Sequence, residues 1–373
     1  MSASFARTDT SVLGRWWWTI DHWILMALGA LIGIGIILTF AASPPSAGRI
    51  GLDSYHFVKQ QMVYLPLGVL IVLSVSLLSP RGIRRVAIAL FIIALAATAL
   101  TLVAGAEYKG ARRWLSLAGM SVQPSEFLKP TFAVFTAWLF SLQRLKPHFP
   151  GNLFAIVSYV AVAGLLILQP DLGMTGIVTA VWFIQFFVSG LRIFWIATLG
   201  AAGIAGLVGA YAALPHVAQR INSFIDPTSG DTYQIDRALE AFMNGGLFGT
   251  GPGAGTVKAH LPDAHADFVF AVLGEEFGLF ACLLLVAVFT AIVLRGLIRA
   301  LQDSDLFIVL ATTGLLVQFA LQALINMASA VNLMPPKGMT LPFVSYGGSS
   351  ILAIAFGMGM VLALTRRRPG ERS

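Results

Sequence analysis

Residues 22–43 read HWILMALGALIGIGIILTFAAS and contain no Asp, Glu, Lys or Arg. About 20 mostly apolar residues in a helix are enough to cross the hydrocarbon core of a membrane, so this run predicts a transmembrane helix. Comparable runs recur along the whole chain, and we count ten of them. They are 22–43, 60–79, 84–104, 124–142, 151–168, 171–189, 191–213, 268–294, 304–330 and 348–365.

The composition supports the same conclusion. Of the 373 residues, 57% are hydrophobic and only 11% are charged, whereas a soluble domain carries about 25% charged residues. The mean hydropathy of +0.82 excludes a fold whose surface faces water. A single cysteine, Cys282, excludes disulfides within the chain and a cysteine metal cluster. We therefore predict an all-α polytopic membrane protein with ten transmembrane helices.

Lysine and arginine residues in the connecting loops predict the orientation. With ten spans, the cations of four short loops and of the tail fall on one side together with both termini, and the positive-inside rule makes that side the cytoplasm. These cations are Arg81, Arg84, Arg85, Arg144, Lys146, Arg192, Arg295, Arg299, Arg366, Arg367 and Arg368. The net charge of +7 has the same explanation, so no nucleic acid is expected as a partner. We expect a cytoplasmic N-terminal segment 1–21, a single transmembrane domain 22–365 and a basic cytoplasmic tail 366–373.

The longer loops face the outside in this arrangement: 44–59, 105–123, 214–267 and 331–347. The longest, 214–267, joins the seventh and eighth helices and includes the glycine-rich stretch 245–255. Glycine at this density is typical of turning backbone, so this stretch is not expected to span the membrane.

The outer loop 105–123 breaks the charge rule, because it contains Lys109, Arg112 and Arg113. The arginine fork donates two parallel hydrogen bonds, which suits a phosphate group. We expect these three residues to bind a pyrophosphate or another anionic headgroup of a substrate. The alternative is simple anchoring to anionic lipid.

Glu126 and Lys129 follow Pro124 near the outer end of the fourth helix. Residues three apart share one helix face and can pair. We expect the pair to lie at or just below the outer interface and to support the site, with ligand binding as the alternative.

Asp267 opens the eighth span at its outer mouth. We expect Pro262 to begin the helix and Asp263 to cap it. A carboxylate at such a mouth is suited to accept a proton from a sugar hydroxyl, although burial and the helix N-terminus act on its pKa in opposite directions. Glu275 and Glu276 lie two to three turns deeper, where pairing with a cation is as strong an expectation as catalysis. The His and Asp spacing matches no zinc pattern, so no metal is assigned.

The last outer loop contains a further candidate cation, Lys337, and the small residues Ser345 and Gly347, and Gly348 follows at the start of the tenth span. Irregular backbone near membrane depth occurs where it lines a cavity or packs inside the protein, and glycine allows close approach. A re-entrant turn that only packs is the alternative. All these regions lie on the outer face, which suits an anionic, membrane-embedded substrate with its headgroup outside.

The sequence resembles the SEDS family (shape, elongation, division and sporulation) over essentially its whole length. The shared motifs are GARRW at 110–114, QPSE at 123–126 with Lys129, QPDLG at 169–173, YQ at 233–234, AHADF at 264–268, GEE at 274–276 and SYGGSS at 345–350. The stretch KGMTLP at 337–342 and Gly274 are similar to the cell-division branch, because the elongation branch usually has proline where Thr340 stands. Departures from the family pattern include Lys109 for Asn, Asp263 for Glu and Ala266 for Thr, and Pro336 is also atypical.

The resemblance implies a peptidoglycan glycosyltransferase that polymerises lipid II, an undecaprenyl-pyrophosphate-linked substrate, on the outer face of the bacterial inner membrane. It also implies a class B penicillin-binding protein as transpeptidase partner, other divisome proteins, and a place at the division septum. By the match at 264–268, Asp267 corresponds to the essential carboxylate of the family.

A reaction that fits these residues has Asp267 take the proton of the acceptor hydroxyl, which then displaces the pyrophosphate with inversion. Arg112, Arg113 and Lys337 would stabilise the growing charge, and a divalent cation (Mg²⁺ or Mn²⁺) would share that task, although no dedicated set of ligands is evident. One alternative is a lipid II flippase, which needs a route between both leaflets. Another is a non-catalytic divisome scaffold, which would not need Asp267 at the mouth of a span.

Overall fold

The computed structural model describes residues 11–108, 111–117, 120–190, 193–213, 218, 222, 233–335 and 338–367. A helix lies over each of the ten expected spans. These helices are α2 (His22–Arg49), α3 (His56–Ser76), α4 (Pro80–Ala104), α5 (Pro124–Leu145), α6 (Gly151–Leu168), α7 (Leu172–Val188), α8 (Ile193–Ala213), α11 (Val269–Leu301), α12 (Leu306–Ala330) and α13 (Gly348–Leu364). Among the described helices, α2, α3, α4, α6, α11 and α12 are long and apolar enough to cross a membrane. The helical polytopic fold is confirmed, and the number of ten crossings stays a prediction.

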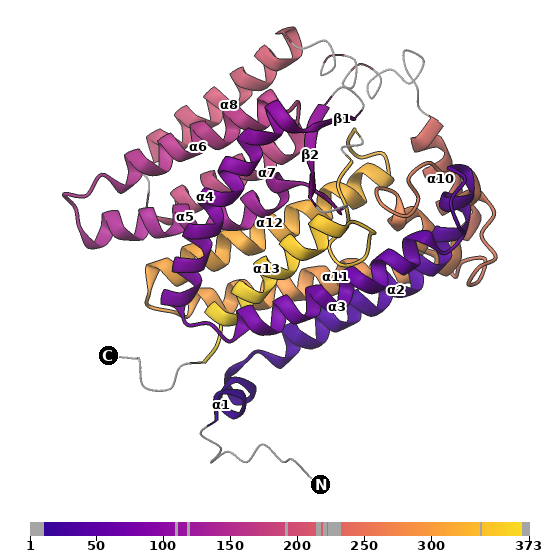
Figure 1. The fold of residues 1–373 in the computed structure, drawn as a ribbon, viewed down its shortest axis with the longest axis horizontal. Coiled ribbons are helices and arrows are strands. Elements are labelled where there is room, and N and C mark those ends of the chain that lie inside the picture. Colours follow the sequence, from indigo (N-terminus) through magenta and orange to yellow (C-terminus); the bar gives the residue numbers. More distant parts are fainter. Residues whose placement is uncertain are drawn as a thin grey trace.

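The centre of the bundle is formed by α5, α12 and α13. In α12, 67% of the most apolar stretch is buried inside the protein, against 28% in α3, α4, α6 and α11. Helix α5 contacts α4, α12 and α13, and α13 also packs along α3 (Figure 1). Small residues permit this closeness: a Cβ at Gly359 of α13 would lie 2.9 Å from Cβ of Val75 in α3.

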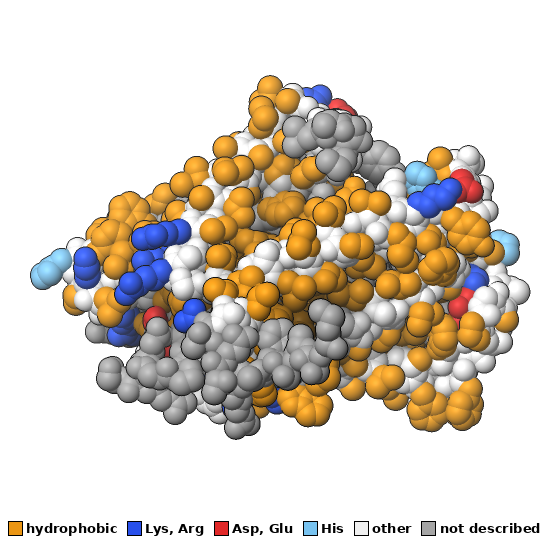
Figure 2. All heavy atoms as spheres, turned by 60° about the horizontal axis from the view of Figure 1, so that its bottom comes forward, with side chains coloured by type: hydrophobic (Ala, Val, Ile, Leu, Met, Phe, Trp, Pro, Cys, Tyr) orange, Lys and Arg blue, Asp and Glu red, His pale blue; other side chains and the backbone are white. Residues whose placement is uncertain are grey.

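The outer surface of the bundle is apolar. Large hydrophobic side chains such as Leu70, Ile92 and Leu284 are exposed on α3, α4 and α11. Figure 2 shows a face that is mostly hydrophobic, with Lys and Arg side chains gathered mainly at one end. An exposed apolar surface of this extent is stable in lipid and not in water.

The beginning and the end of the described chain lie at the same end of the bundle (Figure 1). Helix α1 (Val12–Thr19) precedes α2, and Thr19 accepts hydrogen bonds from the Arg367 amide (3.0 Å) and from Nε of Arg366 (2.9 Å). This contact fits two termini on one side of the membrane. That this side is the cytoplasm stays a prediction.

The segment 105–123, which we expected to be an outer loop, adds a small sheet to the helical fold. It forms a three-stranded antiparallel sheet of β1 (Ala106–Tyr108), β2 (Ala111–Leu117) and β3 (Met120–Val122), with Glu107 opposite Arg112 and Ser116 opposite Ser121. Two of these strands have three residues each, which is too short for the alternation that identifies a strand in sequence.

The segment before α11 also contains structure. Helix α10 (Tyr233–Gly245) and the 3₁₀ helix η2 (Val257–His260) lie there, and the glycine-rich stretch between them forms turns, as predicted. At the other end of the chain, α2 continues to Arg49, past its expected end at residue 43.

Candidate active site around Asp267

Residues 262–268 form a series of turns, and α11 begins only at Val269. Asp263 has a φ of +51°, a left-handed conformation that aspartate tolerates. Its carbonyl accepts the amides of Ala266 and Asp267, both at 3.0 Å. The expected helix start at Pro262 and the capping role of Asp263 are therefore wrong, because this turn delays the helix. Asp267 lies two residues before α11, at its mouth.

The segment from Gly338 to Tyr346 wraps around Asp267. The side-chain amide of Asn326 in α12 donates to the carbonyl oxygens of Asp267 (2.9 Å) and Met339 (2.6 Å). The Tyr346 amide donates to the carbonyl of His265 at 2.9 Å. The structure thus brings the acidic motif of one outer loop together with the glycine-rich motif of the next.

The carboxylate of Asp267 faces a small cavity, which Phe268, Asn326 and Gly338 also line. Its volume of about 10 Å³ is smaller than a sugar. Gly338 has a φ of +64°, and a Cβ there would lie 3.5 Å from Oδ2 of Asp267. Glycine at this position therefore satisfies the backbone conformation and leaves the space beside the carboxylate open.

His265 is a packing residue in this arrangement. Its ring stacks on Phe57 of α3 with 3.8 Å between centroids. Burial lowers the pKa of His265 to about 4, against an opposing effect of the Asp263 charge. Burial, and secondarily the nearby Tyr64, raise the pKa of Tyr346 to about 12, and its hydroxyl donates to Oε1 of Gln60. Both side chains are neutral at pH 7 and join α3 to the loop around Asp267.

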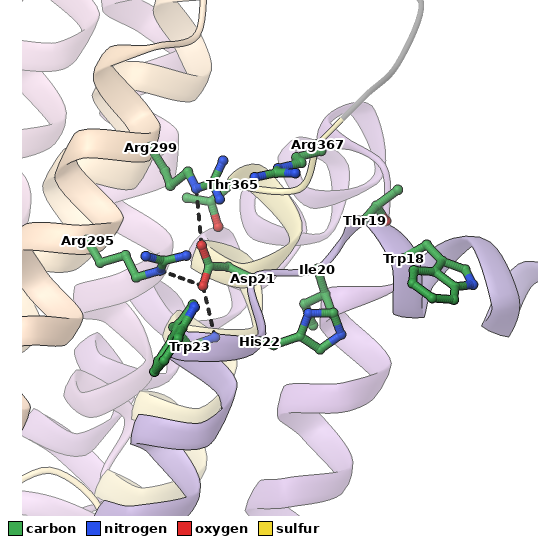
Figure 3. A pocket seen from close by; sticks show the side chains of 10 residues that line it. All are labelled: Trp18, Thr19, Ile20, Asp21, His22, Trp23, Arg295, Arg299, Thr365 and Arg367. Atoms are coloured by element: carbon green, nitrogen blue, oxygen red, sulfur yellow. Dashed lines mark hydrogen bonds and ion pairs between the residues drawn. The ribbon is translucent and has the colours of Figure 1, made fainter. Parts of the chain in front are cut away.

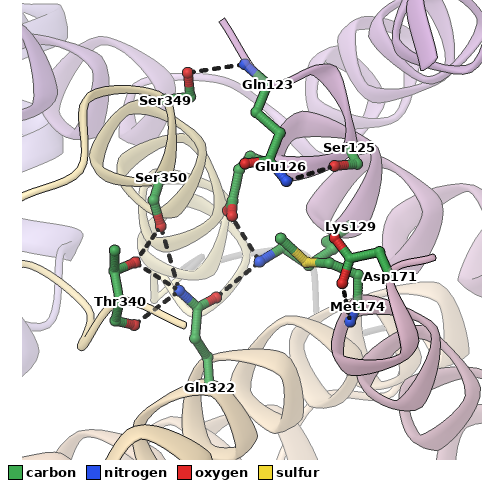
Figure 4. Close-up of polar contacts among 10 residues, drawn as sticks. All are labelled: Gln123, Ser125, Glu126, Lys129, Asp171, Met174, Gln322, Thr340, Ser349 and Ser350. Carbon is green, nitrogen blue, oxygen red and sulfur yellow. Dashed lines mark hydrogen bonds and ion pairs between the residues drawn. The ribbon is translucent and has the colours of Figure 1, made fainter. Parts of the chain in front are cut away.

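A buried polar network lies beneath this loop (Figure 4). Lys129 pairs with Glu126 at 2.9 Å, and their side chains are 2% and 9% exposed. Lys129 also donates to Oε1 of Gln322 at 2.9 Å, and Gln322 donates to the carbonyl of Thr340 at 3.1 Å and to the Ser350 hydroxyl at 3.3 Å. The pair forms as its spacing predicts, but it is packed between α5, α12 and α13 and supports the 338–346 segment from below.

The three small residues predicted to support the site lie where the chain turns into α13. The Ser345 hydroxyl accepts the Leu341 amide at 2.8 Å, which closes the turn. A Cβ at Gly348 would lie 2.6 Å from Cζ of Tyr64, and one at Gly347 would lie 2.9 Å from Cγ2 of Thr340. These glycines allow the loop to pack directly on α3 and on itself.

Glu275 and Glu276 hold the segment 244–258, which includes the glycine-rich stretch, on α11. Glu276 forms a buried ion pair with Lys258. Glu275 accepts the amides of Val257 (2.7 Å) and Lys258 (2.8 Å) and the side-chain amide of Asn244 (2.9 Å). The expected cation is thus Lys258. Sequence reasoning missed it because nothing in the sequence joins a lysine that follows a glycine-rich stretch to an acid 18 residues further along.

The predicted anion-binding cations differ in their surroundings. Arg113 donates from Nε to the Gln169 carbonyl at 3.0 Å and lies 3.6 Å from Oδ2 of Asp171, so it joins β2 to the turn between α6 and α7. Arg112 is exposed and pairs with Glu107 at 3.3 Å. Lys109 and Lys337 lie outside the described residues.

No group of three or more His, Cys, Asp or Glu side chains within the described ranges could hold a metal ion. The described residues therefore offer no set of ligands for the Mg²⁺ or Mn²⁺ ion considered in the sequence analysis.

Comparison with known proteins places this geometry in a family. The sequence profile of the cell cycle proteins FtsW, RodA and SpoVE matches residues 22–369. The chain belongs to the FtsW/RodA/SpoVE family. The match includes the ten helices over the expected spans, the sheet and every residue of the candidate site, so the resemblance to the SEDS family is confirmed.

Relatives of this family are similar over nearly their full length. The chain is 44% identical to a probable peptidoglycan glycosyltransferase FtsW of Caulobacter vibrioides, over 98% of this chain and 94% of that one. It is 33% identical to stage V sporulation protein E of Bacillus subtilis, over 90% and 94%.

Two solved structures are similar in fold. One comes from work on polymerization and crosslinking by a peptidoglycan synthase complex, with a TM-score of 0.76 and 26% identity over 93% of this chain and 97% of that one. The other is the rod shape determining protein RodA of Thermus thermophilus, with a TM-score of 0.69 and 28% identity over 94% and 97%.

Proposed function

We propose that this FtsW/RodA/SpoVE protein is a peptidoglycan glycosyltransferase that polymerises lipid II on the outer face of the inner membrane during cell division. Family membership over residues 22–369 and 44% identity to a probable peptidoglycan glycosyltransferase FtsW support the activity. The observation that carries the assignment of the site is the placement of Asp267 at the mouth of α11, beneath a loop anchored by Asn326.

In this reaction Asp267 acts as the general base. The acceptor 4-hydroxyl of GlcNAc gives its proton to the Asp267 carboxylate, and the oxygen forms a bond to the anomeric carbon of the MurNAc donor. The bond from that carbon to the pyrophosphate breaks, and the undecaprenyl pyrophosphate leaves with the electron pair. A single displacement inverts the anomeric centre. One carboxylate suffices because pyrophosphate leaves without protonation, unlike the sugar alcohol of glycoside hydrolysis.

The surroundings of Asp267 suit a base that must be held in place. Asn326 ties its backbone to Met339, and the buried Lys129–Gln322–Thr340 contacts hold the same segment from below. A base positioned by rigid elements reaches its substrate without loss of geometry.

The pyrophosphate needs cations on the same face. Arg112 is exposed on β2, and its guanidinium, with the ammonium groups of Lys109 and Lys337, is the source of positive charge that we assign to this task. Arg113 acts mainly through β2, because its guanidinium already contacts the turn at Gln169.

A glycan strand must be cross-linked after it is made, so we propose a class B penicillin-binding protein as the transpeptidase partner, together with other divisome membrane proteins at the septum. The similarity in fold to a chain of a peptidoglycan synthase complex supports this assignment.

The test is glycan synthesis by the purified chain with its penicillin-binding partner and lipid II. Asp267→Asn should reduce polymerisation by roughly 10²–10⁴-fold, as expected for loss of a general base. The matched control is Asp263→Asn, which makes the same change at an exposed residue four positions earlier and should keep activity. Equal polymerisation by Asp267→Asn and the parent would refute the assignment. Transfer of lipid II across liposomes without any glycan would favour a flippase.

A further inference from the structure

A second polar site lies at the end of the bundle remote from Asp267. Asp267 precedes the first turn of α11, whereas Arg295 and Arg299 lie in its last turns. Here a cavity of about 580 Å³ is formed between α1, the start of α2, the end of α11 and the residues after α13 (Figure 3). It contains three arginines, Arg295, Arg299 and Arg367, and the aromatic residue Trp18.

The carboxylate in this cavity, that of Asp21, is already paired with two arginines. The side chain of Asp21 is 1% exposed and accepts Nε of Arg295 at 2.7 Å and Nε of Arg299 at 3.1 Å. It also caps α2 by accepting the amides of Trp23 (3.0 Å) and Ile24 (3.2 Å). Burial raises the pKa of Asp21, but the hydrogen bonds from Arg295 and the Ile24 amide and the two arginine charges lower it overall, so the carboxylate stays ionised.

An excess of positive charge therefore faces the cavity. Three guanidinium groups are set against one carboxylate. Arg295 and Arg299 reach Asp21 through Nε, and their terminal nitrogens form no further hydrogen bond with the part of the chain that the structure describes. The arginine fork fits the oxygens of a phosphate group.

The cationic cavity continues into an apolar groove. A neighbouring cavity of about 700 Å³ shares Arg295, Arg299 and Arg367 with the first. It extends between α2 and α11 along residues such as Ala27, Ala291 and Ile298. A free phosphate ion would not use this groove, but an acyl chain joined to a phosphate would use both parts.

We propose that this site binds one anionic glycerophospholipid of the cytoplasmic leaflet, with its phosphate on the three arginines and an acyl chain in the α2–α11 groove. The proposal rests on the predicted cytoplasmic position of both termini and is independent of the polymerase chemistry. Basic pockets between transmembrane helices on the cytoplasmic side recognise anionic headgroups, and tryptophan favours the headgroup layer. A zwitterionic lipid carries its own cation and gains less from the excess charge.

The probe is phosphatidylglycerol added to the full chain in detergent, with phosphatidylcholine of the same acyl chains as the comparison, and native mass spectrometry as the readout. Phosphatidylglycerol should bind at least fivefold more tightly. Arg367→Gln should weaken its binding about fivefold, the effect expected for one arginine near an anionic headgroup. This variant is preferred to one at Arg295 because it keeps both Asp21 contacts.

The control is Arg85→Gln, which removes the same charge from an exposed residue of α4 and should leave binding unchanged. Ala291→Trp should fill the groove and weaken phosphatidylglycerol binding while the melting temperature stays near that of the parent. The site is wrong if Arg367→Gln and Arg85→Gln bind phosphatidylglycerol equally, or if phosphatidylcholine binds as tightly. Binding of soluble glycerol phosphate as tight as that of phosphatidylglycerol would overturn the lipid as the occupant.

Discussion

Replacement of Lys258 by methionine would leave the carboxylate of Glu276 without its cation. The two side chains are 8% and 1% exposed, so water does not replace the lost partner. Removal of one member of a buried ion pair costs about 3–5 kcal/mol, because an uncompensated charge stays buried. The amide of Lys258 also donates to Glu275, so the damage should concentrate where the 246–261 loop docks on α11.

Hydrogen exchange measures this local effect directly. A loss of about 3–5 kcal/mol corresponds to a rise of roughly a hundredfold or more in the open population of the loop. The amides of Val257 and Lys258, which donate to Glu275, should therefore exchange faster by that factor in Lys258→Met. Amides in the middle of α4 should change little, because η2 in this loop contacts α2, α10 and α11.

Two further variants separate the charge effect from packing. Lys258→Met combined with Glu276→Gln removes both charges and should recover most of the protection. Lys59→Met makes the same substitution in an ion pair with Asp53 whose side chains are 73% and 57% exposed, and it should leave stability almost unchanged. Equal exchange in Lys258→Met and Lys59→Met, or no recovery in the double variant, would refute the reasoning.

Two other predictions concern the same face of the molecule. Gly278 interrupts α11 with φ +76° and ψ −174°, and a Cβ there would lie 2.4 Å from the carbonyl oxygen of Leu247. Gly278→Ala should therefore lower the free energy of unfolding by at least about 1–3 kcal/mol. The control Gly164→Ala, whose Cβ would have no atom within 4 Å, should be neutral or stabilising, and equal melting temperatures of the two variants would contradict this prediction. Because the pKa of His265 is lowered from 6.5 to about 4 in the folded protein, the unfolded chain takes up the proton first, and stability should fall as the pH drops from 6.5 to 4. His265→Phe keeps a ring against Phe57 and should flatten the pH dependence of the melting temperature in that window, and an unchanged profile would exclude His265 as its cause.

Local sequence was sufficient for the helices, since a membrane span is recognised by its own length and composition. The ten expected segments coincide with α2 to α8 and α11 to α13. The sheet at 106–122 escaped prediction because its strands are stabilised by each other and not by their own pattern. The helix start at Pro262 was wrong because the left-handed Asp263 is held by a turn whose amides come from later residues.

For the candidate site too, some features follow from the sequence and others only from the tertiary structure. The sequence by itself determined that the chain is a polytopic helical membrane protein of this family, since apolar length and motif order are properties of the chain alone. That Asp267, Glu126 and Lys129 lie toward the outer face stays a prediction from the charges of the loops. Only the tertiary structure decided which groups meet: Asn326 with Asp267, Gln322 with Lys129, and Lys258 with Glu276. These partners come from other helices and loops. A buried polar group must find a partner wherever packing brings one, and packing depends on all of the helices together.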